Sequence, residues 1–320
     1  MILWGGLQRN PFSFDITPVS NSISHLYFPL SLAPAAFWTH VRSDGGDIRV
    51  YKQDGTQIAR QITGFDPVAK TGALWIKKDS GTAFRVKYGN VAWTEPAANS
   101  TYGSQNAWES ALKLVMHCND FADSTGNAQS ISHSAGVTAN ESGKIGGAIK
   151  STLATDYVAV AHNSSLVFSD LTAVTWINWS STSSGRIFDK ASGNNGFKLF
   201  VSDSSGGLVL AGYSTNISTS AGACPSGAWH QVAATIDSSG NGAIYVDGVS
   251  VKTGSTEAPS GIPAVDLKLF NRGDNLRPLI ASADETRFYN RVLSPTEIAD
   301  MYANQNTPAT FWTIGSESQA

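Results

Sequence analysis

The sequence predicts an all-β protein built from two β-sandwich domains in tandem, and three observations lead to this prediction. Residues 229–252, WHQVAATIDSSGNGAIYVDGVSVK, alternate apolar with polar or small residues in three short runs separated by turn residues. Asp247-Gly248 between the last two runs indicates a tight hairpin, because a type I′ turn needs positive φ at both central positions. The 320 residues suffice for about two domains, and the 30 glycines suit short strands joined by tight turns.

The N-terminal part of the chain is expected to contain an arm followed by the first sandwich. Residues 1–22 carry Pro11, Pro18 and several aromatic residues without periodicity. We therefore expect an irregular arm that docks onto the body of the chain or onto a neighbouring subunit. Residues 23–93 alternate apolar runs with turn residues, which indicates a small β domain. Its strands are predicted at 25–31, 47–51, 57–63, 73–78 and 83–88.

The rest of the chain is expected to contain a linker, the second sandwich and a tail. Residues 94–112 include the sequence EPAANS, which is typical of a linker. Residues 113–305 form the second domain. Near its end Ser294 can cap a short helix, and Glu297 completes a capping box. Residues 306–320 are a tail that we expect to dock back or onto a partner.

Several segments of the second domain carry a resemblance to a known family. They include GKIGGA, DYV, LTAVTW, IFDK, GAWHQVAATID, GAIYVDGVSV and IASADETRFYNRVLS, in this order. Together they resemble the laminin-G-like, concanavalin A-like β-sandwich domains over roughly residues 113–305. The resemblance implies a jelly roll, and it says little about activity, because such sandwiches serve as binding modules, adhesins and enzymes alike.

The first domain carries a second resemblance. The segment RSDGGDIRVYKQDGTQIARQITGFD, together with TGALWIKK and FRVKYGN, resembles a bacterial and phage β domain of unassigned function. That domain often directly precedes a laminin-G-like domain. The pairing in this order resembles bacteriophage virion proteins of the tail, the fibre or the capsid decoration.

Composition excludes some classes of partner. The formal net charge is −3 and Lys and Arg form no block, which argues against a nucleic-acid partner. No run of about 18 apolar residues occurs, so we expect no membrane span. The first residues, MILWGGLQRNPFSF, lack a basic region followed by an apolar stretch, so we expect no signal peptide. Cys118 and Cys224 are too few for a disulfide scaffold, and either two free thiols or one bridge fits them.

Calcium is the first candidate ligand. The segment Asp123-Ser124-Thr125-Gly126-Asn127 places an acid, hydroxyl groups and a glycine turn within five residues. A hard cation is held by six to eight oxygens, some of them backbone carbonyls, and such a turn can present them. In laminin-G-like domains a turn of this kind often lies beside the acid of the last long strand. By resemblance, Asp123 and Asp284 are the expected side-chain ligands, and an Asx-turn with a surface acid is the alternative.

Carbohydrate is the second candidate ligand. Aromatic faces hold sugars, together with hydrogen bonds from amides and carboxylates. Trp176 and Trp229 sit within predicted strands, where core packing is expected. Loop residues are therefore the expected contacts with a glycan: Asn194, Asn195, Tyr213, Asn271 and Arg272.

No catalytic pattern stands out in the sequence. A retaining glycosidase on this fold needs two carboxylates about 5 Å apart on one face of a strand, and no Glu-x-Asp-x-Glu segment occurs. Asp284 and Glu285 are adjacent, so a regular strand would direct them to opposite faces. Motifs of serine hydrolases, zinc proteases and phosphate-binding loops are also missing. We therefore expect no enzymatic activity.

The leading hypothesis is a non-enzymatic virion structural protein whose laminin-G-like domain attaches to host surface glycans. Such a protein would be made in the host cytoplasm, leave by lysis and reside in the virion. Its expected partners are other virion subunits and host cell-surface polysaccharide, and a homo-oligomer is also considered. The alternative is a secreted or surface-bound bacterial carbohydrate-binding or adhesion module. A polysaccharide-cleaving enzyme, with carboxylates from separate strands, is a third and less favoured hypothesis.

Overall fold

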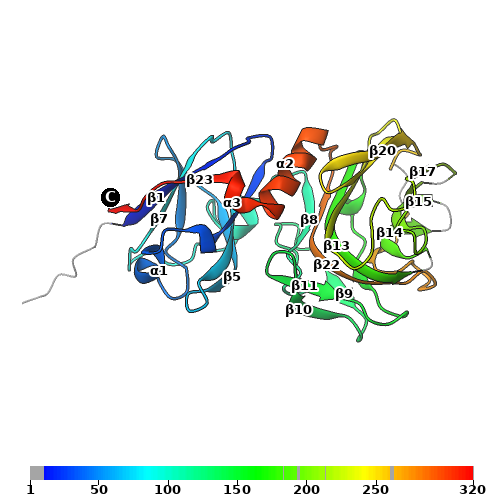
Figure 1. Ribbon diagram of the computed structural model, residues 1–320, viewed down its shortest axis with the longest axis horizontal. Helices are drawn as coiled ribbons and strands as arrows, with labels where there is room; N and C mark the ends of the chain where they lie inside the picture. The colour runs from blue at the N-terminus through cyan, green and yellow to red at the C-terminus, as the bar shows by residue number, and fades with distance from the viewer. Residues whose placement is uncertain (1–10, 183, 193–194, 213, 260–262, 320) are drawn as a thin grey trace, which may run out of the picture. The chain divides into compact units, whose positions relative to one another are not determined.

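A computed structural model describes residues 11–182, 184–192, 195–212, 214–259 and 263–319 of the chain. The chain divides into two compact units (Figure 1). The first unit takes the chain up to Glu109 together with the residues from Ala303 onward, and the second unit is Ser110–Tyr302. The second unit is therefore inserted into the sequence of the first.

The strands of the first unit that the structure describes form two antiparallel sheets. Within the described residues, one sheet has the order β23-β1-β7-β3-β4, with β24 also pairing with β1. Its strands are β23 (Trp312–Ile314), β1 (Phe12–Pro18), β7 (Phe84–Tyr88), β3 (Arg49–Lys52), β4 (Gln57–Ile58) and β24 (Ser318–Gln319). The other sheet contains β2 (His25–Pro29), β6 (Thr71–Lys77) and β5 (Arg60–Asp66). Short helical segments connect them: Leu30–Leu32, α1 (Phe37–His40), Ser104–Ala107 and α3 (Pro308–Phe311).

Strand β1 joins the two ends of the chain. Ile16 of β1 pairs in register with Ile314 of β23, and Figure 1 shows the red β23 beside the blue β1. The Trp312 indole N–H donates to the backbone carbonyl of Tyr27 at 2.9 Å. Over residues 12–18 the structure thus differs from the irregular arm that was expected for residues 1–22, of which residues 1–10 lie outside the described part of the chain. Buried apolar positions alternate along Phe12–Pro18, and that pattern suits a strand covered on one face.

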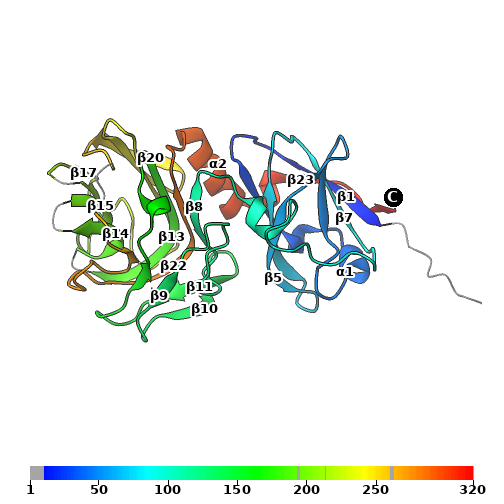
Figure 2. The same ribbon diagram turned by 180° about the vertical axis from the view of Figure 1, so that it is seen from behind.

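The described strands of the second unit form a sandwich of two larger antiparallel sheets, which Figures 1 and 2 show from opposite sides. In the part of the chain that the structure describes, the first sheet has eight strands: β10 (Thr138–Ser142), β11 (Gly147–Lys150), β22 (Leu279–Tyr289), β13 (Leu171–Thr182), β18 (His230–Ile236), β19 (Asn241–Val246), β20 (Val249–Ser255) and β8 (Leu112–Met116), which pairs with β22. The second sheet, again counted over described residues, has seven: β17 (Asn216–Ser218), β16 (Leu208–Ala211), β15 (Asn195–Val201), β14 (Arg186–Ser192), β21 (Leu267–Leu269), β12 (Val158–Val160) and β9 (Ile131–His133). A short turn of helix, Ser164–Leu166, leads into β13.

One hydrophobic core holds the two sheets of the second unit together. Phe188 of β14 meets Phe288 of β22 edge to face, with ring centroids 5.3 Å apart. Buried aromatic pairs of this kind contribute about 0.5–1.5 kcal/mol beyond the area they remove from water. Cys118 and Cys224 are buried free thiols in the same core. The prediction of an all-β fold is confirmed.

Two local predictions are also confirmed. Asp247 and Gly248 have φ of 51° and 78°, as the type I′ turn between β19 and β20 requires. Helix α2 (Pro295–Asn306) begins with the predicted capping box. The Ser294 backbone N–H donates to Glu297 Oε2 at 2.8 Å, and the Glu297 N–H donates to the Ser294 hydroxyl at 3.2 Å. No helix within the described residues is long and apolar enough to cross a membrane.

Candidate binding site

A row of alternating charges crosses three strands of the seven-stranded sheet. Asp189 of β14 pairs in register with Lys198 of β15 on one side and with Lys268 of β21 on the other. The strand neighbours of the two lysines belong to the hydrophobic core: Phe197, Leu199, Leu267 and Leu269. Because side chains alternate along a strand, the charged row lies on the opposite face of the sheet from the core. Opposite charges facing each other across strands stabilise a sheet by about 0.2–1 kcal/mol per pair.

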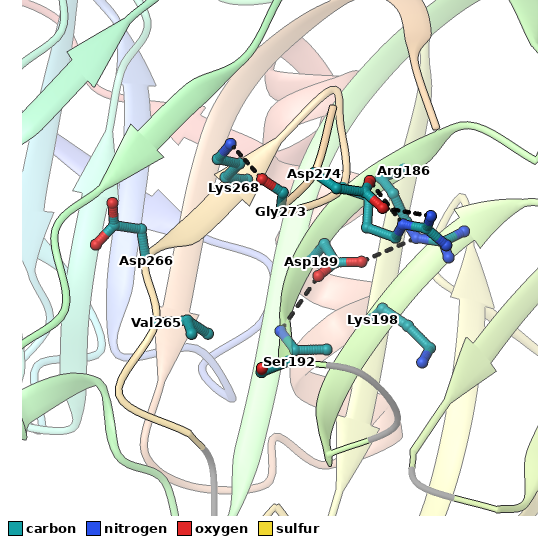
Figure 3. A pocket seen from close by; sticks show the side chains of 11 residues that line it. Arg186, Asp189, Ser192, Lys198, Val265, Asp266, Lys268, Gly273 and Asp274 are labelled. Carbon is teal, nitrogen blue, oxygen red and sulfur yellow. Dashed lines mark hydrogen bonds and ion pairs between the residues drawn. The ribbon is translucent and has the colours of Figure 1, made fainter. Parts of the chain in front are cut away.

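The row lines an open cavity of about 810 Å³, which we call the charged cavity (Figure 3). Its volume lies in the range of about 300–1,000 Å³ that is usual for small-molecule sites. The basic residues that line it are Arg186, Lys198, Lys268 and Arg272. The acidic residues that line it are Asp189, Asp266 and Asp274. Charge therefore dominates the chemistry of this cavity.

Arg186 and Asp189 form a buried ion pair at the base of the cavity. Arg186 Nε lies 2.9 Å from Asp189 Oδ2, and Asp189 Oδ1 accepts the backbone N–H of Ala191 at 3.2 Å. The Arg186 guanidinium also lies over the ring of Phe200, 4.3 Å from its centroid. Burial raises the pKa of Asp189 and lowers that of Arg186, while the opposite charge of each partner counteracts the shift. Both oxygens of Asp189 are thus engaged by the protein.

Arg272 and Asp274 form an exposed ion pair in the segment between β21 and β22. Arg272 donates from Nε to Asp274 Oδ1 at 2.8 Å and from Nη2 to Oδ2 at 2.5 Å. The hydrogen bonds from Arg272 lower the pKa of Asp274 to about 2. The two side chains are 35% and 46% exposed, so the pair adds little stability and can be reached by a ligand.

The two lysines of the row differ in their partners. Lys268 Nζ donates to the carbonyl of Gly273 at 3.0 Å and to Asn275 Oδ1 at 2.9 Å. It also lies 4.3 Å from the centroid of the Tyr157 ring. Lys198 makes no hydrogen bond or ion pair with any residue that the structure describes. Partial burial lowers the pKa of Lys198, and the nearby Asp189 opposes the shift. Lys198 is therefore the cation of the cavity that can accept a new partner.

The wall of the cavity opposite β14 is fixed by a buried lysine. Lys190 of β14 is fully buried, and its Nζ donates to the carbonyl of Val265 at 2.5 Å. The same Nζ lies 3.1 Å from His162 Nδ1, and burial lowers the pKa of Lys190 to about 8. Asp266 Oδ1 accepts the backbone N–H of His162 at 3.0 Å. These contacts position Val265 and Asp266 at the cavity.

Of the described residues that the sequence predicted as glycan contacts, only Arg272 lines this cavity. Asn271 is fully buried, and its amide nitrogen donates to the carbonyls of Ala154 and Asp156 at 3.1 Å and 3.2 Å. Its Oδ1 accepts two backbone N–H groups, so Asn271 shapes the loop and offers nothing to a ligand.

Asn195 is exposed and closes the hairpin between β14 and β15, where it pairs with Ser192. Ser192 lines the cavity, whereas Asn195 is the strand partner of this lining residue and does not itself line the cavity. Asn194 and Tyr213 fall outside the described residues.

Sequence reasoning missed the row itself. Lys198 stands between apolar residues in FKLFV, and Lys268 stands between two leucines. Each pattern predicts a single charge on the outer face of a strand. The sequence does not show that Asp189 lies between them, because the order of strands in a sheet depends on pairings distant in the chain. The pairing of β14 with both β15 and β21 brings the three charges together.

Asp123, an expected calcium ligand, has both carboxylate oxygens engaged by the chain. Oδ1 accepts the backbone N–H groups of Val115 at 3.1 Å and Thr125 at 3.0 Å. Oδ2 accepts the Thr125 hydroxyl at 2.8 Å and the backbone N–H of Gln129 at 3.0 Å. Three backbone N–H groups and one hydroxyl, all of them donating hydrogen bonds, surround this carboxylate. The contacts match the alternative of an Asx-turn, in which donors of the chain itself occupy both carboxylate oxygens.

Asp284, the other expected calcium ligand, is fully buried on β22. Its Oδ2 accepts the Ile145 backbone N–H at 2.7 Å, and its buried Oδ1 has no hydrogen-bond partner among the described residues. Burial raises the pKa of Asp284 well above its ordinary value, and the neighbouring Glu285 adds to the shift. The described part of the chain contains no group of three His, Cys, Asp or Glu that could hold a metal. Calcium binding at Asp123 and Asp284 thus stays a prediction of the resemblance.

Comparison with solved structures shows similarity of fold. The binding domain of Paraclostridial Mosquitocidal Protein 1 is 17% identical, with 60% of this chain and 52% of that chain covered and a TM-score of 0.50. The receptor binding domain of botulinum neurotoxin C/D mosaic serotype is 15% identical, with coverages of 61% and 51% and a TM-score of 0.51. The binding domain of botulinum neurotoxin DC in complex with rat synaptotagmin II is 17% identical, with coverages of 62% and 52% and a TM-score of 0.50. The chain spans about half the length of these domains.

Comparison with family models locates the similarity in the second unit. Residues 152–299 match the model of the concanavalin A-like lectin/glucanases superfamily. No curated relative matches the chain. The matched segment contains most strands of the sandwich, including the three that carry the charged row. Over residues 152–299 the second unit is therefore similar to the laminin-G-like, concanavalin A-like β-sandwich domains, and it has their fold.

Proposed function

We propose that the protein is a non-enzymatic attachment protein that binds host surface glycans through the charged cavity of its second unit. We further propose that it acts as part of a bacteriophage virion, in a tail, a fibre or a capsid decoration. The single observation that carries the binding proposal is the charged cavity on the outer face of a lectin-like sheet.

The cavity offers the groups that a sugar needs. A hydroxyl group both donates and accepts hydrogen bonds, so a site for sugars combines acceptors with donors. Asp266 and Asp274 supply carboxylate acceptors, and Arg272 and Lys198 supply cationic donors. The row behind them is built on β14, β15 and β21, whose other face is packed in the core. Groups held on such rigid strands lose little conformational freedom when a ligand binds.

The contacts of the acidic residues favour recognition over catalysis. A retaining glycosidase uses one protonated carboxyl and one free carboxylate close to the scissile bond. Asp274, with a pKa near 2, is ionised at neutral pH and paired with Arg272. Asp189 is held by Arg186 and by the Ala191 backbone N–H. Release of reducing sugar from any substrate in a broad polysaccharide panel would overturn the non-enzymatic proposal.

Two lines of similarity support attachment to a cell surface. The solved domains of similar fold are described as binding or receptor-binding domains. The first unit resembles a bacterial and phage β domain that often precedes a laminin-G-like domain. The secreted or surface-bound bacterial adhesion module is the alternative, because it shares the same binding chemistry.

Mass spectrometry of purified phage particles tests the virion proposal. We expect peptides from both units at a stoichiometry that stays constant through density-gradient purification. Detection of the protein only in the medium or on the surface of uninfected cells would support the bacterial module instead.

A glycan array probed with the labelled full chain tests the binding proposal. We expect saturable binding to one or a few bacterial polysaccharides. The double variant Arg272→Ala/Asp274→Ala should weaken binding about tenfold or more, because hydrogen bonds to charged groups contribute about 1.5–3 kcal/mol. This exposed pair adds little to folding, so the variant should remain folded. Lys252→Ala on the exposed strand β20 is the matched control and should bind normally.

A further inference from the structure

The charges that line the cavity do not cancel. Two of the three acidic residues are matched by arginines, since Asp189 pairs with Arg186 and Asp274 pairs with Arg272. Two lysines and one carboxylate remain, namely Lys198, Lys268 and Asp266. The unmatched charge of the lining is therefore positive.

The positive charge is concentrated at one end of the row. Lys268 already has two oxygen acceptors and a tyrosine ring. Burial lowers the pKa of Lys268, and the charge of the nearby Asp266 opposes that shift. Asp189 lies between Lys198 and Lys268 in the register of the sheet. The Asp189 carboxylate is already hydrogen-bonded to Arg186. Lys198 thus has three donor hydrogens and no acceptor among the described residues.

An anionic ligand group would complete this arrangement. A carboxylate or a sulfate supplies the acceptor that the Lys198 ammonium lacks, and a charge-assisted hydrogen bond is roughly twice as strong as a neutral one. A neutral sugar hydroxyl gives a weaker bond and leaves the charge uncompensated. Partial burial strengthens the attraction, because solvent screens a half-buried pair less than an exposed one.

We propose that the charged cavity selects acidic glycans, and that Lys198 is the residue that recognises their anionic group. This inference rests on the proposed glycan-binding function and names the ligand class for the same site. Lys198 determines specificity by direct contact, while Arg186 and Asp189 position the strand on which it stands.

Matched pairs of soluble probes test the inference on the full chain. Oligogalacturonate and its methyl ester share a backbone and differ in whether the carboxyl groups are charged or methylated, and dextran sulfate and dextran differ only in the sulfate groups. We expect each acidic probe that binds to do so at least about tenfold more tightly than its neutral counterpart, which corresponds to about 1.4 kcal/mol. The preference should weaken as salt is raised. The two pairs distinguish a carboxylate site from a sulfate site.

Three variants assign the preference to Lys198. Lys198→Met keeps an unbranched apolar side chain without the charge. It should lower the affinity for the acidic probe to the affinity for its neutral counterpart. Lys198→Arg retains the charge and should retain the preference. Lys252→Met, on the exposed strand β20, removes an equal charge elsewhere and should leave the preference unchanged.

The outcomes separate this inference from the proposed function. Equal affinity for acidic and neutral probes, lost in Arg272→Ala/Asp274→Ala, would overturn the inference and support the glycan site. An acidic preference that survives in Lys198→Met would also overturn it. Absence of binding to every probe and every glycan of the array would overturn both proposals.

Discussion

Two clusters of charged side chains in the second unit differ in what surrounds them. The interior cluster, formed by His117, Asp284, Glu285 and Arg287, is enclosed, and none of these residues is more than 5% exposed. In the charged cavity, by contrast, solvent reaches the lining, as the exposure of Arg272 and Asp274 shows.

In the interior cluster the pKa of a carboxyl group is lowered only where cations accompany it. Glu285 Oε1 lies 2.7 Å from His117 Nδ1, and Glu285 Oε2 lies 2.9 Å from Arg287 Nη2. Burial alone would raise the pKa of Glu285, but His117 and Arg287 outweigh burial and lower it. The next residue, Asp284, forms no ion pair with a cation in the described part of the chain, and its pKa is raised.

The comparison shows where a protein can keep an unmatched charge. An uncompensated charge in the interior destabilises the fold by several kcal/mol, so the buried group becomes neutral instead. Lys198 in the cavity retains its charge at a much smaller free-energy cost, because water still solvates part of the side chain. An unmatched charge at an open cavity is consequently available for binding, whereas one in the core is removed by a pKa shift.

Glu285→Gln should produce the largest effect, because it breaks the interior cluster. Glutamine keeps the shape of the side chain but leaves His117 and Arg287 without their anion. Removing one partner of a buried ion pair destabilises by about 3–5 kcal/mol. We expect the urea midpoint of the second unit, followed by circular dichroism of the full chain, to fall accordingly.

The matched variant in the cavity is Lys198→Gln, which removes a charge that has no partner. We expect its change in unfolding free energy to stay within the about 0.5 kcal/mol usual for surface substitutions. Equal losses of stability in the two variants would contradict the distinction between the clusters.

Asp284→Asn should have a smaller effect of the opposite sign at neutral pH. The pKa of Asp284 is raised in the folded state, so the folded protein holds a proton that the unfolded chain has released. Stability contributed by this group is therefore fully present below the unfolded pKa of about 3.9 and is lost as pH rises toward the folded pKa. Asparagine keeps the acceptor for the Ile145 N–H and does not titrate.

The measurement is the free energy of unfolding in urea at several pH values above about 5. In this range the carboxyl groups of the unfolded chain are largely ionised. The stability that the lowered pKa of Glu285 contributes is therefore fully present and no longer changes with pH. We expect the variant to be more stable than the native protein at neutral pH, by more than about 0.5 kcal/mol. The difference should shrink as the pH is lowered, and a difference that is independent of pH would refute the role given to Asp284.

Local signals in the sequence predicted local structure well. The Asp247-Gly248 turn and the Ser294 capping box depend on contacts between residues at most a few positions apart. Long-range pairing was harder to foresee. Residues 12–18 form a strand because β7 and the distant β23 flank them, and neither partner can be recognised from the segment alone.

The same limit explains what the sequence predicted about the site. Arg272 was recognised as a loop residue of suitable chemistry, and it lines the cavity. The sequence makes its neighbour Asn271 an equally suitable glycan contact. In the structure, however, the Asn271 amide donates to the carbonyls of Ala154 and Asp156. Asp284 and Glu285 also depart from simple alternation. Glu285 has φ of 49° at an irregularity in the pairing of β22 with β13, and both residues are buried.

Calcium provides the smallest expected effect and a third case for the comparison. Asp123 is an acid whose four hydrogen bonds come from the chain itself, so it needs no side-chain cation to be satisfied. A ligand present at about 100 times its Kd would stabilise the folded state by about 2.7 kcal/mol. We expect the thermal midpoint of the full chain to be the same in millimolar calcium and in chelator, within the error of the measurement. A clear rise with calcium that disappears in Asp123→Ala would instead support the calcium site that the resemblance predicts, and it would show that a cation can displace the donors that now surround this carboxylate.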